Sequence, residues 1–191
     1  MRRKRVLIPI AVVVLIVVAA VTLQLTSLVF STVGGKSASN APTIPACNAR
    51  YPSEGFSYHF RDPHRGELVV IHARGQIGGL ITPDPDARDL NLTKRVVGAP
   101  GDTVLARNGH VFINGKKADN IQTAAFPATR LGADEYFVLG DNRSAAQDSR
   151  VFGPVPRNAI FGRVFLIYWP LGRFGTVGYD KNLVPPGEVD C

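Results

Sequence analysis

A long apolar run near the start of the chain gives way to short apolar and polar stretches that alternate to its end. The run begins at Val6 and reads VLIPIAVVVLIVVAAVTL, and no charged residue occurs between Arg5 and Lys36. A helix of this length can cross the roughly 30 Å hydrocarbon core of a bilayer. The pattern therefore predicts a transmembrane helix over residues 6–28.

Positive charge lies directly before this run. Residues 1–5 read MRRKR, and cations beside an apolar span usually stay on the cytoplasmic side of the membrane. The rest of the chain is then expected to be extracytoplasmic, with residues 29–36 as a linker. A cleaved secretory signal is the alternative, but its apolar region usually covers only about 7–15 residues. The longer run favours an uncleaved, single-pass anchor in the plasma membrane.

Beyond the linker, short β-prone runs replace helical periodicity. ELVVIHA, KRVVGAP, DTVLA, EYFVLG and RVFLIYWP are separated by turn signals such as DPHRG and PGD. Many short strands with Gly and Pro between them predict a mostly β fold, an antiparallel sandwich or barrel over residues 37–191. Asn-Gly pairs at positions 108–109 and 114–115 are hairpin signals, because both turn positions need positive φ. They predict a small β insertion over residues 105–133.

The net charge of +7 is consistent with an anionic partner. The cations cluster before the apolar run and are scattered elsewhere, without a basic stripe or a groove-reading motif. Membrane lipid is therefore the expected anionic partner, and nucleic acid is not.

The two cysteines and four histidines of the chain do not predict a metal site. No Cys-x-x-Cys or close pair of histidines accompanies Cys47 and Cys191, and no Gly-rich phosphate loop precedes a helix. An extracytoplasmic location permits a disulfide between the two cysteines, but their positions leave this open. The sequence predicts no metal and no cofactor.

Serines and lysines provide the candidate chemistry. A serine hydroxyl needs an adjacent base to act as a nucleophile, and a lysine can serve only when it is neutral. The ordinary lysine pKa is about 10.4, and burial lowers it by up to about 3–5 units. Lys36 follows two glycines and precedes polar residues, so it should be solvated. Lys94 opens the strand-like run KRVVGAPGD, in which alternation places Lys94 and Arg95 on opposite faces. The alternative interpretation is an edge-strand lysine in water.

A polar stretch, GDNRSAAQDSRVFG, covers residues 140–153. It is either an exposed loop or a segment held rigid by bidentate arginine–carboxylate pairs. In the second case, Asp141 and Asp148 would pair with Arg95, Arg143 or Arg150.

Four segments, in this order, resemble the bacterial type I signal peptidases, which are membrane-anchored Ser/Lys proteases. SASNAPTIP resembles the family's nucleophile segment, Ser-x-Ser-Met-x-Pro-Thr-Leu. DPHRGELVVIHA resembles its Arg-Gly-Asp-Val-Val strand, and KRVVGAPGDTV resembles its base-bearing strand. GDNRSAAQDSRVFGPVPRNAIFGRV resembles its last segment, Gly-Asp-Asn-Arg…Asp-Ser-Arg…Gly.

The resemblance implies roles for individual residues. Ser39 would be the nucleophile and Lys94 the general base, while the Ser37 hydroxyl and the Ser39 amide would form the oxyanion hole. A supporting network that orients these groups would consist of Arg95, Asp141, Asp148 and Arg150.

The resemblance also implies a reaction and a substrate. The chain would be a membrane-bound serine endopeptidase that removes N-terminal signal peptides from exported preproteins. The substrates would carry small residues before the cut, typically Ala-x-Ala. An extended substrate would add as a strand, and residues 90–93 (LNLT) are the candidate edge.

Two positions depart from the family pattern. Asn40 stands where methionine usually follows the nucleophile, and Ala146 stands where a serine often bonds the base lysine. These departures leave alternatives open: a catalytically weakened relative, a peptidase specialised for one substrate, or a scaffold without turnover. A self-cleaving repressor of the Ser/Lys type would instead carry a DNA-binding helical domain.

Overall fold

The chain divides into two compact units, Met1–Ser31 and Thr32–Cys191. The computed structural model describes residues 11–22, 30–35, 37–73, 77, 80 and 90–182.

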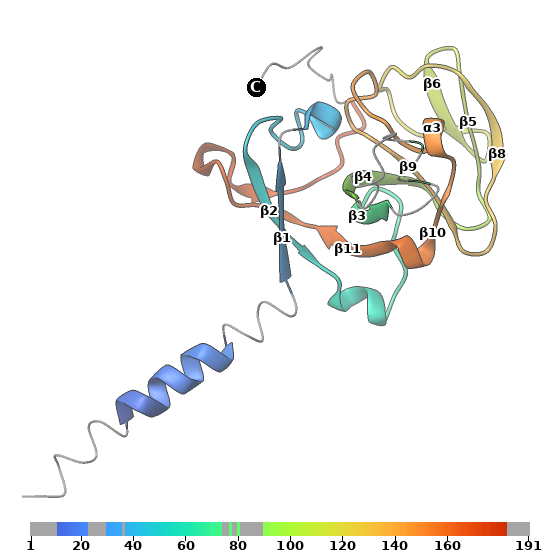
Figure 1. Ribbon diagram of the computed structural model, residues 1–191. Coiled ribbons are helices and arrows are strands. Elements are labelled where there is room, and N and C mark those ends of the chain that lie inside the picture. The colour runs from blue at the N-terminus through green and yellow to red at the C-terminus, as the bar shows by residue number, and fades with distance from the viewer. Residues whose placement is uncertain are drawn as a thin grey trace, which may run out of the picture. The chain divides into compact units, whose positions relative to one another are not determined.

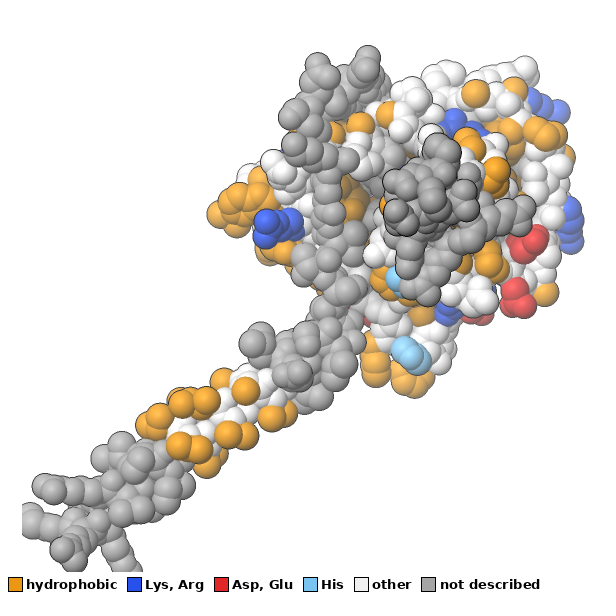
Figure 2. Space-filling model, viewed as in Figure 1, with side chains coloured by type: hydrophobic (Ala, Val, Ile, Leu, Met, Phe, Trp, Pro, Cys, Tyr) orange, Lys and Arg blue, Asp and Glu red, His pale blue; other side chains and the backbone are white. Residues whose placement is uncertain are grey.

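Residues 11–22 form a helix in the first unit. Its valine, leucine and isoleucine side chains are exposed along its length (Figure 2). Within the described residues, no helix is both long and apolar enough to cross a bilayer. The span predicted over residues 6–28 extends beyond the described residues at both ends and stays a prediction.

A seven-stranded sheet organises the second unit (Figure 1). Its order is β1-β2-β11-β3-β4-β9-β10, so β4 lies between β3 and β9. The strand pairs from β2 to β10 are antiparallel, which confirms the predicted mostly β, antiparallel fold. The strands are β1 (Phe30–Gly35), β2 (Ala49–Glu54), β3 (Leu68–Ala73), β4 (Leu90–Gly98), β9 (Glu135–Leu139), β10 (Val155–Pro156) and β11 (Ile160–Val164).

A four-stranded antiparallel sheet, in the order β7-β6-β5-β8, is formed by the segment between β4 and β9. Asn108 and Gly109 have φ of 51° and 78°, and Asn114 and Gly115 have φ of 50° and 79°. Both Asn-Gly turns therefore adopt the positive φ predicted for hairpins. The strands are β5 (Thr103–Arg107), β6 (His110–Ile113), β7 (Lys116–Lys117) and β8 (Phe126–Arg130), and a separate pair consists of β12 (Leu166–Ile167) and β13 (Gly175–Thr176).

Short helical turns connect the strands. The 3-10 turn η1 carries the serine segment, and the loop after β9 (residues 140–148) leads into the helix α3, which lies within the polar stretch. The turns are η1 (Ala38–Asn40), η2 (Phe56–His59), α3 (Ser149–Phe152), η3 (Arg157–Ala159) and η4 (Leu171–Arg173).

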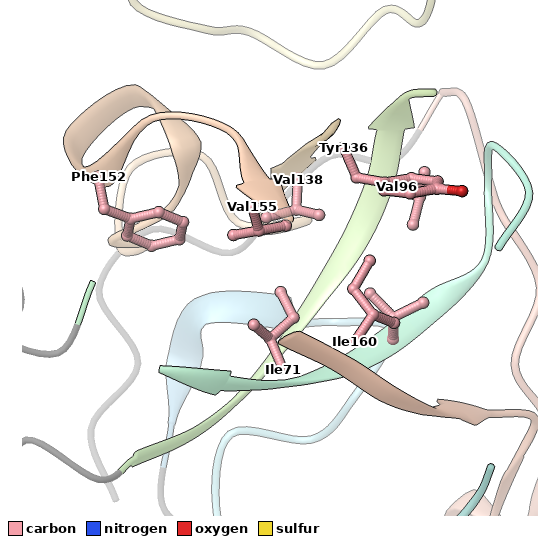
Figure 3. Packing of buried hydrophobic residues seen from close by; sticks show 8 residues of the cluster. Ile71, Val96, Tyr136, Val138, Phe152, Val155 and Ile160 are labelled. Carbon is pink, nitrogen blue, oxygen red and sulfur yellow. The ribbon is translucent and has the colours of Figure 1, made fainter. Parts of the chain in front are cut away.

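The core lies on both faces of β4. Val96 packs in a cluster with residues of β3, β9 and α3, such as Ile71, Val138 and Phe152 (Figure 3). Val97 packs in a different cluster, which includes residues of β5 and β6. Successive side chains of a strand point to opposite faces, so β4 contributes to two cores at once. This double burial holds the strand that carries Lys94 firmly in place.

Cys47 takes part in a disulfide, and Cys191 lies outside the described residues.

Candidate active site

The structure brings Ser39 and Lys94 together. Lys94 Nζ lies 3.0 Å from Ser39 Oγ, although the two residues are 55 positions apart in the sequence. Ser39 lies in η1 and Lys94 lies in β4, opposite Val69 of β3. A hydroxyl and an amine at this distance can exchange a proton.

Lys94 is buried. Its exposed fraction is only 4%, so the alternative of a solvated edge-strand lysine is wrong. Burial lowers the pKa of Lys94 to about 8. The Asp148 carboxylate opposes this change, the Arg150 cation adds to it, and Asp141 opposes it further. Because desolvation dominates, a sizeable fraction of the amine is neutral near neutral pH.

Ser37 lies beside Ser39. Ser37 Oγ donates to Ser39 Oγ at 3.0 Å and accepts from Ser39 N at 3.3 Å, as the N-cap of η1. The Ser37 hydroxyl and the Ser39 amide are therefore adjacent donors next to the Ser39 oxygen. Donors in such a position can stabilise an oxyanion that forms on a carbonyl attacked by Ser39.

The loop after β9 packs directly against η1. Asn142 N donates to Ser39 O at 3.1 Å. A Cβ on Gly140 would lie 2.4 Å from Ser39 O and 2.3 Å from the Cβ of Ala146, so no larger residue fits at position 140. Glycine permits this close approach of the loop to the backbone of Ser39.

Arg95 points away from Lys94 and forms a bidentate ion pair with Asp141. Arg95 Nε donates to Oδ1 at 2.6 Å, and Nη2 donates to Oδ2 at 2.5 Å. Arg95 Nη1 donates to Gly66 O at 2.7 Å, and the guanidinium lies 4.8 Å from the centre of the Tyr179 ring. The loop after β9 is thereby tied to the residue that follows Lys94.

A second bidentate pair stiffens the same loop. The fully buried carboxylate of Asp148 accepts from Arg150 Nε at 2.7 Å and from Arg150 Nη2 at 2.8 Å. It also accepts from Gly140 N at 3.0 Å. Arg150 Nη2 donates to the carbonyls of Arg143 and Ala146. The polar stretch is therefore held rigid by ion pairs and hydrogen bonds, and the alternative of an exposed loop is wrong.

The sequence did not single out a third buried pair, between Arg143 and Asp119. Arg143 Nη2 lies 2.6 Å from Asp119 Oδ2, and Nη1 donates to Thr123 Oγ1 at 2.6 Å. The Tyr179 hydroxyl donates to Asp119 Oδ2 at 2.7 Å, and burial and this carboxylate raise the pKa of Tyr179. Asp119 follows two lysines and an alanine in a polar segment, so no local pattern distinguishes it from a surface residue.

Replacing Asp119 with alanine is expected to destabilise the fold by about 3–5 kcal/mol, because the buried Arg143 would lose its counter-charge. The matched control is Asp62→Ala. Asp62 pairs with Arg157, but its side chain is 77% exposed, and such pairs contribute less than about 1 kcal/mol. Thermal unfolding of the full chain in detergent measures the difference. Equal shifts in melting temperature for the two variants would contradict the prediction.

Among the described residues, no group of three or more His, Cys, Asp and Glu side chains is arranged to hold a metal ion.

Comparison with known proteins identifies the family to which this chain belongs. Residues 7–169 match the family described as signal peptidase, peptidase S26. A probable signal peptidase I-2 of Synechocystis sp. is 39% identical over 151 residues, which cover 76% of this chain and 66% of the relative. A signal peptidase I of Leptolyngbya laminosa is 37% identical over 147 residues, which cover 74% of this chain and 70% of the relative.

A solved structure of a signal peptidase I from Enterococcus faecalis aligns with a TM-score of 0.43 and 25% identity, over 54% of this chain and 97% of that one. The family match covers most of the chain, so the chain belongs to the peptidase S26 family of signal peptidases, which are serine endopeptidases. It spans about two thirds of the length of the two curated relatives.

Proposed function

We propose that this chain is a serine endopeptidase that removes N-terminal signal peptides from exported preproteins with a Ser39–Lys94 dyad. The observation that carries the proposal is the 3.0 Å contact between Ser39 Oγ and the buried Lys94 Nζ. A lysine with a pKa of about 8 supplies enough neutral amine to act as a base. Family membership supports the choice of signal peptides as substrates.

The reaction is acyl transfer to water. Neutral Lys94 accepts the Ser39 proton while Oγ attacks the scissile carbonyl, and the bond to the leaving amine then breaks as Lys94 returns the proton to it. Lys94 next takes a proton from the water that attacks the acyl-enzyme, and returns this proton to Ser39 Oγ as the bond between Oγ and the acyl group breaks. The Ser37 hydroxyl and the Ser39 amide donate to the oxyanion at both stages.

The supporting network orients these groups. Arg95 and Asp141 connect β4 to the loop after β9, while Asp148 and Arg150 hold the loop itself. None of these four residues transfers a proton in the proposed reaction.

The side of β4 that faces β9, over the residues that do not pair with β9, is the proposed site for an extended substrate. Leu90 to Thr93 pair with β3 on one side, whereas the pairing with β9 begins only at Arg95. Residues 90–92 therefore have a side that is not paired with β9, where an extended peptide can add as a strand.

The proposal includes a membrane location. Residues 6–28 would form the anchor, with residues 1–5 in the cytoplasm and residues 29–36 as the linker. The catalytic domain, residues 37–191 with a β insertion at 105–133, would lie outside the plasma membrane. Tethering would place Ser39 near the point where a substrate's own apolar segment leaves the bilayer.

The test uses the full chain in lipid–detergent micelles with a preprotein that carries Ala-x-Ala before its cleavage site. Mass spectrometry is expected to find one cut, directly after the second alanine. Replacing that alanine with phenylalanine should abolish this cut, whereas the same replacement at the middle position should not. A parent protein that leaves the preprotein intact, or that cuts without regard to the two alanines, would contradict the proposed function.

A further inference from the structure

The residue that follows Ser39 has a buried side chain with two hydrogen-bond partners. Asn40 is only 4% exposed. Its Nδ2 donates to Thr93 O at 2.7 Å, and its Oδ1 accepts from Asp141 N at 3.4 Å. The carbonyl of Thr93 needs a donor and the amide of Asp141 needs an acceptor, so the two contacts together determine the orientation of the Asn40 side-chain amide.

The stronger of these contacts joins the immediate neighbours of the two dyad residues. Asn40 follows Ser39 in η1, and Thr93 precedes Lys94 in β4. The two bonded residues are 53 positions apart in the sequence, so the bond connects segments that meet only in the folded chain. It lies one residue from the Ser39–Lys94 contact on each side.

The other contact joins η1 to the loop after β9. Asp141, whose amide bonds Asn40, also holds the Arg95 guanidinium with its carboxylate. The Asn40 amide therefore lies where η1, β4 and this loop meet. An aliphatic or thioether side chain of similar size would occupy the same space but would donate no hydrogen bond to Thr93 O.

We propose that Asn40 is a positioning residue that holds Ser39 Oγ and Lys94 Nζ at reacting distance and keeps η1 closed over the amine. The inference rests on the proposed function, because the distance between Ser39 Oγ and Lys94 Nζ matters only if these two groups react with each other. A displacement of about 1 Å between reacting groups can cost about 100-fold in rate. Loosening η1 also admits water to Lys94, whose low pKa depends first on desolvation.

The test compares Asn40→Leu with the parent and with Val111→Ala in the full chain in detergent. Val111 is fully buried in the four-stranded sheet, so its truncation to alanine lowers the stability of the fold without a change at the dyad. Two quantities are measured: the Lys94 pKa, from the NMR titration of ¹³C-labelled lysine side chains, and the steady-state cleavage of the Ala-x-Ala preprotein. The Lys94 signal is identified by its absence in Lys94→Met.

In Asn40→Leu, the pKa of Lys94 is expected to rise by about one unit or more toward the ordinary value of about 10.4. The value of kcat should fall about 10- to 100-fold with KM changed less than about threefold, because the substrate still binds while the dyad is misplaced. Val111→Ala should leave both the titration and kcat as in the parent. If Asn40→Leu lacks a cooperative unfolding transition, the smaller Asn40→Ala takes its place.

A Lys94 titration in the Asn40 variant that matches the parent overturns the proposal, whatever the cleavage rate. So does a kcat that falls no further than in Val111→Ala. If the parent cleaves no preprotein at all, the proposed function fails, and the titration alone still decides the positioning role of Asn40.

Discussion

Replacing Ser39 with alanine is expected to lower kcat for the Ala-x-Ala preprotein by at least about 10⁴-fold, because the acyl-enzyme can no longer form. Lys94 would remain buried, but the hydroxyl 3.0 Å from its Nζ would be gone. The KM should change little, since the substrate strand pairs with β4 and not with the Ser39 side chain. Cleavage is measured by gel and confirmed by mass spectrometry of the products.

Ser57→Ala is the matched control, because it removes the same hydroxyl from η2, where Ser57 Oγ bonds Glu54. It should cleave at the parental rate. An Ser39→Ala protein that cleaves within about tenfold of the parent would show that another group is the nucleophile. If neither the parent nor Ser39→Ala cleaves, the alternative of a scaffold without turnover is favoured.

Replacing Lys94 with methionine is expected to lower kcat by about 10²- to 10⁴-fold, the usual contribution of a general base. Methionine fills similar space but accepts no proton. Lys94→Arg should lose as much, although it keeps the positive charge, because a guanidinium does not deprotonate in proteins. Lys117→Met, at an exposed position of β7, is the control and should cleave like the parent.

The parent should also show a pH dependence with a definite sign. Protonated Lys94 cannot accept the Ser39 proton, so kcat/KM should rise about tenfold per pH unit below the lysine pKa and level off above it. The midpoint should lie at about 8, the lowered pKa of Lys94. A solvated lysine would place the midpoint near 10.4. A rate that is flat from pH 6 to about pH 9, or that falls over this range, would exclude Lys94 as the base.

Local sequence was sufficient for several of the strands, such as β3, β5 and β9, and for the faces of β4, but it did not predict β2, β8 or the short helical turns. The alternation in KRVVG predicted opposite directions for Lys94 and Arg95, and the structure has Lys94 at Ser39 and Arg95 at Asp141. The two Asn-Gly hairpins were predicted correctly, because positive φ is a property of the turn residues themselves.

The ion pairs could be predicted only in part from the local sequence. The sequence left the partners of the arginines open, and the structure pairs Asp141 with Arg95 and Asp148 with Arg150. It pairs Arg143 with Asp119, a carboxylate 24 positions away that no pattern marks. A partner at this separation depends on how the segment after the four-stranded sheet packs against the loop after β9. Local sequence does not specify the distance between Arg143 and Asp119.

For Asn40, the sequence showed an unusual residue but not its contacts. Its identity was visible as a departure from the family pattern, and the sequence suggested a change in packing or in the substrate pocket. Its bonds to Thr93 and Asp141 came only with the fold.

The amino-acid sequence by itself determined that the chain is mostly β, because strand alternation and turn residues are local properties. Its resemblance to a known family, carried by short motifs, indicated which serine and lysine were candidates for the chemistry. Only the tertiary structure decided that the amine of Lys94 is buried away from solvent and lies 3.0 Å from the Ser39 hydroxyl. Desolvation and a contact across 55 residues arise from the packing of η1, β4 and the loop after β9 against one another, and no segment encodes them alone.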